Sequence, residues 1–193
     1  MDSKMKVVIA AVVITVAIII FIYFKEIKSY IKMINLDGRQ KDFIKDLQPQ
    51  AQGIFAAFFS RIEKETNYRF YPTSGYRDYA KQAQLHLENS SNAPAGSSMH
   101  NFGLAIDGNG VNKETGVFEL KKATDKQLWI DSGIPQIAAD LGLTWGGNFS
   151  NYYDPIHFGF DGVIPIAELQ ALAASTYGLD PTKVIGNKLN IVV

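Results

Sequence analysis

The pattern of apolar and polar positions separates an apolar first segment from a mixed remainder. Residues 7–24 (VVIAAVVITVAIIIFIYF) form an apolar run that only Thr15 interrupts. A helix of this length spans about 27 Å, close to the thickness of a bilayer core. The run ends in aromatic residues and Lys25, without the small-residue cleavage site of a signal peptide. We therefore expect an uncleaved membrane anchor, with a buried core helix or a poorly cleaved signal peptide as the alternatives.

The remainder mixes short helices with short strands after a polar segment, residues 33–46, which we interpret as a membrane-proximal linker. Apolar spacings of three and four, together with proline and glycine positions, predict helices over 47–65, 78–88, the second half of 124–142 after Pro135, and 165–175. Alternating or short apolar stretches predict strands over 68–73, 102–108, 143–147 and 155–160. Residues 89–98 have a loop composition, and residues 111–122 suit a hairpin excursion. Since no βαβ regularity is present, an α+β fold is favoured.

Length and charge limit the possible organisation. The chain has 193 residues, enough for one domain with a proper core. We therefore predict a membrane anchor and juxtamembrane segment at 1–35 and one domain at 36–193. Lysines and arginines balance the acidic residues, with 19 of each class. This balance gives no sign of a nucleic-acid-binding surface.

The candidate chemistry rests on a few histidines and acids. The chain has no cysteine and three histidines, so a transition-metal site must use histidine and carboxylate ligands. His100 precedes one predicted strand, Asp107 lies within it, and His157 begins another. Two histidines and one carboxylate suit a catalytic zinc ion. Asp154, three residues before His157, is placed to act as a proton acceptor.

The sequence then resembles a known family. The blocks SGYRD (74–78), SMHNFGLAID (98–107), LTWGG (143–147) and DPIHF (154–158) resemble those of the M15 zinc peptidases, in the family's order and spacing, over residues 47–160. The resemblance implies a small central antiparallel sheet with flanking helices, the fold of Hedgehog and the D,D-peptidases, here preceded by one transmembrane helix.

The resemblance also implies roles for individual residues. His100, Asp107 and His157 would bind Zn²⁺, and Asp154 would act as the catalytic base. Arg77 would lie beside the scissile carbonyl and stabilise the oxyanion, with a structural salt bridge as its alternative role. Ser98 would support the substrate or its own loop by hydrogen bonding. Trp145 would shape the groove and contact the substrate, with packing alone as its alternative role. His86 belongs to no motif and is expected on the surface.

The implied substrate is a stem peptide of peptidoglycan. An aspartate at the base position is typical of the L-alanyl-D-glutamate endopeptidases, which favours that activity in a bacterial or phage protein. The alternatives are a D-alanyl-D-alanine carboxypeptidase or dipeptidase, and a non-catalytic wall-binding subunit of a membrane apparatus. We expect residues 7–24 to contact lipid and the catalytic domain to face the cell wall. The alternative is a protein of a virion membrane. Assembly partners would then lie in the virion or in the cell envelope. One departure concerns Gly108, which follows Asp107 where an apolar residue is expected.

Overall fold

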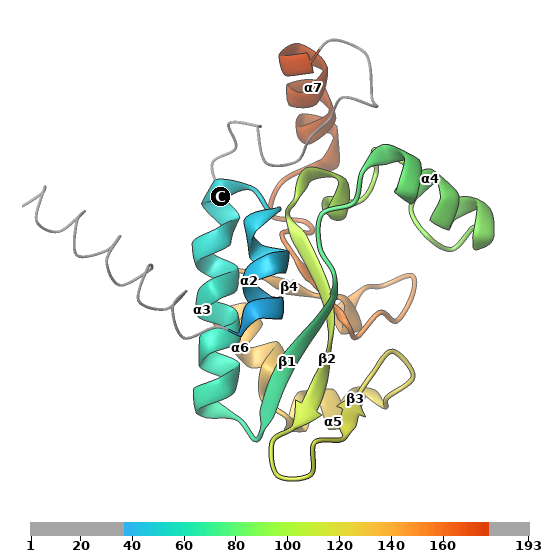
Figure 1. The fold of residues 1–193 in the computed structure, drawn as a ribbon. Coiled ribbons are helices and arrows are strands. Elements are labelled where there is room, and N and C mark those ends of the chain that lie inside the picture. The colour runs from blue at the N-terminus through green and yellow to red at the C-terminus, as the bar shows by residue number, and fades with distance from the viewer. Residues whose placement is uncertain (1–36, 178–193) are drawn as a thin grey trace, which may run out of the picture.

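The computed structural model describes residues 37–177, which form an antiparallel sheet with helices around it (Figure 1). Neighbouring strands lie in the order β1-β2-β5-β4, and β3 pairs with β2. All four pairings are antiparallel. The strands are β1 (Tyr68–Ser74), β2 (Ala105–Asn112), β3 (Phe118–Leu120), β4 (Thr144–Trp145) and β5 (His157–Gly159). The predicted α+β class with an antiparallel sheet is confirmed.

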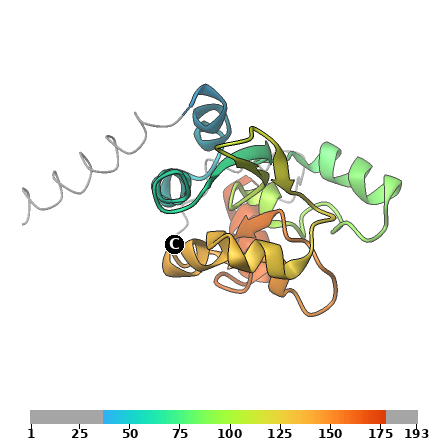
Figure 2. The same ribbon diagram turned by 90° about the horizontal axis from the view of Figure 1, so that it is seen from below.

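The helices lie around this sheet. They are α2 (Gly38–Lys45), α3 (Pro49–Glu65), α4 (Tyr79–Glu88), α5 (Lys126–Asp131), α6 (Ile134–Asp140) and α7 (Ile166–Tyr177). Two views show α4 projecting away from the sheet and from α3 (Figures 1 and 2). The predicted helices at 47–65, 78–88 and 165–175 are confirmed. The helix expected after Pro135 begins at Ile134, and α5 before it was not predicted.

An aromatic cluster joins α3 to the sheet. Phe58 of α3 lies with its ring centroid 5.3 Å from Phe70 of β1 and 4.9 Å from Phe158 of β5. Phe59 stacks on Phe70 at 5.2 Å. These side chains are almost fully buried. The spacing of the apolar positions in α3 therefore places one helix face directly on the strands that carry the site.

The interpretation of residues 33–46 as a linker is wrong for its second half, where α2 forms. Its start is a capping box, in which the Asp37 carboxylate accepts from Gln40 N and the Gln40 side chain accepts from Asp37 N. Arg39 Nε and Gln40 Nε2 donate to the carbonyls of Pro72 and Phe70, at 2.7 and 2.9 Å. The helix thus covers the free edge of β1. Besides these polar contacts, Ile44 is fully buried in the core and Phe43 packs against the core. Two adjacent apolar residues do not form the repeated spacing that predicts a helix, so the hydrophobic pattern gave no signal.

The strand expected at 102–108 is also displaced. Residues Met99–Phe102 form a 3-10 turn, and β2 runs from Ala105 through Gly108 to Asn112. The unexpected glycine has a steric reason, because a Cβ at Gly108 would lie 2.4 Å from Phe70 Cε1 and 2.8 Å from the Tyr71 carbonyl oxygen. The hairpin suggested for 111–122 forms between β2 and β3.

The expected anchor at residues 7–24 lies outside the described residues, as do residues 178–193 of the tail. Between residues 37 and 177, no helix combines the length and the apolar character needed to cross a membrane.

Candidate metal centre

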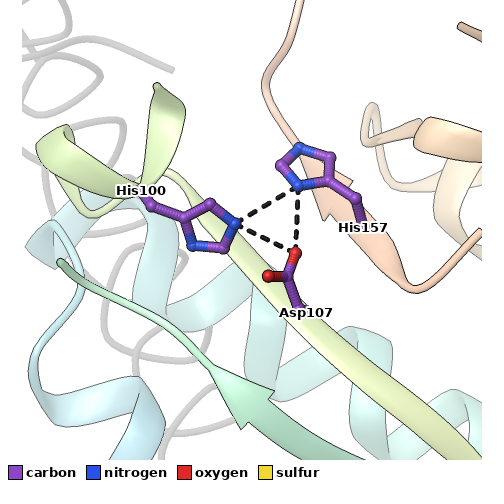
Figure 3. A group of neighbouring side chains, drawn as sticks. All are labelled: His100, Asp107 and His157. Carbon is purple, nitrogen blue, oxygen red and sulfur yellow. Dashed lines mark hydrogen bonds and ion pairs between the residues drawn. The ribbon is translucent and has the colours of Figure 1, made fainter. Parts of the chain in front are cut away.

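Three side chains meet where β2 and β5 pair. Asp107 and His157 are directly opposite each other in the antiparallel register, and His100 comes from the turn that precedes β2. His100 Nε2 lies 3.0 Å from Asp107 Oδ1 and 3.3 Å from His157 Nδ1, and His157 Nδ1 lies 3.1 Å from Asp107 Oδ1. All three residues are buried and point toward one another (Figure 3).

The outer nitrogen of each imidazole has its own acceptor. His100 Nδ1 lies 2.7 Å from the carbonyl oxygen of Gly75, and His157 Nε2 lies 2.7 Å from Asp161 Oδ2. Because a carbonyl and a carboxylate only accept, each outer nitrogen carries the proton. In the neutral rings, His100 Nε2 and His157 Nδ1 then direct their lone pairs toward Asp107 Oδ1.

This arrangement fits a zinc ion. Tetrahedral zinc with bonds of about 2.0–2.1 Å to nitrogen or oxygen has ligand atoms about 3.3 Å apart, and the observed separations are 3.0–3.3 Å. Three lone-pair donors that converge without a proton between them repel one another unless a cation lies among them. Among the residues described, Asp154 is not part of this close group, so a fourth position is left for water or substrate.

The electrostatics of the metal-free pocket agree with this reading. Burial disfavours the charge on Asp107, yet the charges and hydrogen bonds of His100 and His157 outweigh burial and hold the pKa of Asp107 well below its ordinary value. Burial lowers the pKa of His100. Burial also opposes the charge on His157, but hydrogen bonds to Asp107 and Asp161 prevail and raise its pKa to about 10. Without a metal, a proton on His157 therefore provides the positive charge.

Arg77 binds the far side of the same carboxylate. Its Nη2 donates to Asp107 Oδ2, and its Nε donates to Ser74 Oγ at 2.7 Å. Its Nη1 lies 3.4 Å from Gln82 Oε1. Arg77 is thus held at the metal site and lines the adjoining cleft. The salt bridge considered as its alternative role is present, and its placement in the cleft leaves the predicted role toward substrate open.

The cleft beside the three ligands has a volume of about 180 Å³ and contains Asp154 in its lining. The Asp154 N–H donates to the Gly146 carbonyl and its own carbonyl accepts from His157 N, which fixes its loop against the third ligand. Its Oδ1 is shielded from solvent and has no hydrogen-bond donor in the region described, although Lys122 Nζ lies 3.5 Å away. A carboxylate so placed is free to accept a proton in the cleft.

The other predicted residues take different places. Ser98 lines the cleft, and its hydroxyl accepts from His100 N at 3.4 Å. Trp145 is buried, does not line the cleft, and donates from Nε1 to the Pro155 carbonyl at 2.8 Å. The structure therefore shows a packing role for Trp145, and its predicted contact with substrate stays a prediction. His86 is only partly buried, outside the metal group, with Nδ1 2.6 Å from the Asn92 carbonyl oxygen.

Sequence reasoning missed two residues of the site. Asp161 and Lys122 both line the cleft, and neither belongs to a motif block. Asp161 lies four residues after His157, and on an extended strand that spacing gives no reason to expect contact. Only the turn after β5, which ends at Gly159, brings the carboxylate back to the ring.

Comparison with known proteins gives a family for this part of the chain. A model of the M15 peptidases described as D-alanyl-D-alanine carboxypeptidase matches residues 91–160, the range that holds all three ligands and Asp154. The peptidoglycan L-alanyl-D-glutamate endopeptidase CwlK of Bacillus subtilis is 29% identical over 97 residues. That match covers 44% of this chain and 56% of CwlK, so the chain spans little more than half of that relative's length.

Solved structures show partial likenesses. The L-Ala D-Glu endopeptidase ChiX of Serratia marcescens has a TM-score of 0.48 and 20% identity, covering 64% of this chain and 87% of ChiX. The D,D-dipeptidase VanXYg has a TM-score of 0.43 and 19% identity, covering 66% of this chain and 60% of VanXYg.

Proposed function

Because this chain belongs to the M15 family of peptidases, we propose that it is a zinc-dependent hydrolase of peptidoglycan stem peptides. The observation that carries the proposal is the separation of roles around one cleft. His100, Asp107 and His157 form a compact ligand group, while Asp154 lines the same cleft outside that group. A zinc ion that only stabilised the fold would need neither the cleft nor a carboxylate beside it.

The side chains divide the chemistry of amide hydrolysis among them. A zinc ion held by the three ligands would supply Lewis acidity for the scissile carbonyl and the attacking water. Asp154 accepts the proton of that water and returns it to the nitrogen of the leaving amine. Arg77, fixed by Asp107 and Ser74, provides a positive charge at the cleft where negative charge develops on the carbonyl oxygen.

The bond cleaved is proposed to lie between L-alanine and D-glutamate. Two features support it: the aspartate at position 154, typical of that branch, and the similarity to CwlK, which is named for this activity. A D-alanyl-D-alanine carboxypeptidase is the second candidate, favoured by the description of the matching family model.

Digestion of purified peptidoglycan by the full-length protein tests both candidates. New N-terminal D-glutamate supports the endopeptidase, and free D-alanine supports the carboxypeptidase. The Asp154→Asn variant, loaded with zinc, serves as the matched inactive control. If the wild-type protein binds zinc and releases neither product, the hydrolase proposal fails and a non-catalytic wall-binding subunit becomes the better description.

Residues 7–24 are proposed to anchor the enzyme in a membrane, with residues 37–177 on the side of the wall. The support is the length and apolar character of the run. Since the chain has no cysteine, the substitution Glu114→Cys at an exposed position would introduce a unique site for labelling. Its reaction with a membrane-impermeant maleimide in intact cells is expected. Reaction only after lysis would reverse the proposed topology.

A further inference from the structure

The least expected contact of the metal centre lies behind His157. Its Nδ1 faces the other two ligands, and its Nε2 lies 2.7 Å from Asp161 Oδ2. The ring is therefore held from both sides. Asp161 is not itself part of the ligand group, and its side chain is about one quarter exposed, at 27%.

Several local features hold the Asp161 carboxylate in this position. Thr144 Oγ1 donates to the Asp161 carbonyl at 2.6 Å, and Asp161 forms a bridge with Ile164. Gly159 leaves the necessary space, because a Cβ there would lie 2.7 Å from Asp161 Oδ2. The chain thus turns after β5 so that the Asp161 carboxylate lies against the imidazole ring of His157, the first residue of that strand.

The two histidines differ in the charge of their outer partners. The acceptor for His100 is the neutral carbonyl of Gly75, whereas the acceptor for His157 is a carboxylate. Arg77 binds the second oxygen of Asp107 and offsets much of that ligand's negative charge. A second carboxylate near the ligands then compensates for the charge that Arg77 neutralises.

We propose that Asp161 is a positioning residue for the metal centre, which fixes the Nε2–H tautomer and the orientation of His157 and adds negative charge behind it. This inference rests on the proposed zinc site and does not depend on the substrate. Partners of this kind orient ligating histidines and raise their basicity, and their loss costs about 10- to 100-fold in metal affinity.

Zinc affinity of the full-length protein provides the test. Metal-free protein is titrated with Zn²⁺ in the presence of a competing chelator. Asp161→Ala is expected to bind zinc 10- to 100-fold more weakly. Asp161→Asn should fall between this variant and the wild type, because its amide oxygen can still accept from Nε2–H but carries no charge. Glu168→Gln removes one exposed acid of α7 that contacts no ligand, and serves as the matched charge control.

A spectroscopic readout separates positioning from general stability. In the zinc-loaded protein, ¹⁵N NMR should show His157 with a protonated, hydrogen-bonded Nε2, and Asp161→Ala should lose this signal while circular dichroism of the metal-free variant stays unchanged. If Asp161→Ala does not fold, the isosteric Asp161→Asn decides the question. Zinc affinity within twofold of the Glu168→Gln control, in any folded Asp161 variant, overturns the proposal.

The proposed function can fail separately. If the wild-type protein binds zinc but releases no peptidoglycan product, the hydrolase assignment is refuted, while the zinc titrations still decide the role of Asp161.

Discussion

Replacing Asp154 by asparagine should separate catalysis from metal binding. Asp154 lies outside the ligand group, and its Oδ1 accepts no hydrogen bond from the residues described. Its ion pair with Lys122 spans 3.5 Å, and the lysine side chain is 65% exposed, so the pair contributes about 1 kcal/mol or less after screening by solvent. The variant should fold and bind zinc like the wild type. Loss of a general base should lower kcat about 100- to 10,000-fold, which is about 2.7–5.4 kcal/mol in the activation barrier.

His157→Ala provides the contrast, because it removes one of three ligands. A zinc ion present at a hundred times its Kd stabilises the folded state by about 2.7 kcal/mol. At about 3 °C per kcal/mol for a domain of this size, this corresponds to about 8 °C in Tm. Differential scanning calorimetry with and without zinc should show this difference in the wild type and in Asp154→Asn, and should not show it in His157→Ala.

Two results would refute this reasoning. If Asp154→Asn loses the zinc-dependent rise in Tm to the same extent as His157→Ala, Asp154 is a ligand and its assigned role is wrong. If Asp154→Asn keeps its zinc and retains a kcat within tenfold of the wild type, another group accepts the proton.

Three further predictions concern the metal-free pocket and the fold. The pKa of His157 is raised to about 10, so zinc binding at pH 7.5 should release close to one proton. Calorimetry in buffers of different ionisation enthalpy measures this release. If no proton is released, the ring is already neutral. Because this pKa exceeds the unfolded value of about 6.5, the metal-free chain should lose stability as the pH rises from about 6.5 toward 10, seen as a falling urea midpoint. Gly108→Ala should destabilise the fold by about 1–3 kcal/mol in urea unfolding, because its Cβ would meet the Phe70 ring. Gly38→Ala, which has open space around it, should leave the urea midpoint unchanged. Equal midpoints for the two variants would contradict the steric explanation.

Much of the site follows from residue types and order along the chain. The absence of cysteine leaves histidine and carboxylate as metal ligands, and motif order points to His100, Asp107 and His157. Residue periodicity places α3 and the strands because apolar side chains of one face must be buried together. These inferences succeed because they depend on local geometry and on the chemistry of single residues.

Other features depend on contacts that no local pattern encodes. Helix α2 begins at a capping box and contacts the edge of β1 through polar side chains. Its apolar residues, such as the buried Ile44, lack the repeated spacing that predicts a helix. Gly108 is explained by the Phe70 ring and the Tyr71 carbonyl, and Phe70 lies 38 positions earlier in the chain. The pairing of Arg77 with Asp107 likewise joins residues that the motif assigned to separate roles.

The sequence by itself indicated which side chains are candidate metal ligands, through their residue types and their order along the chain, and the family motif indicated Asp154 as the candidate base. Only the tertiary structure decided how each ligand is oriented, since the tautomer of an imidazole depends on the partner of its outer nitrogen. For His157 that partner is Asp161, which a turn after β5 returns to the ring.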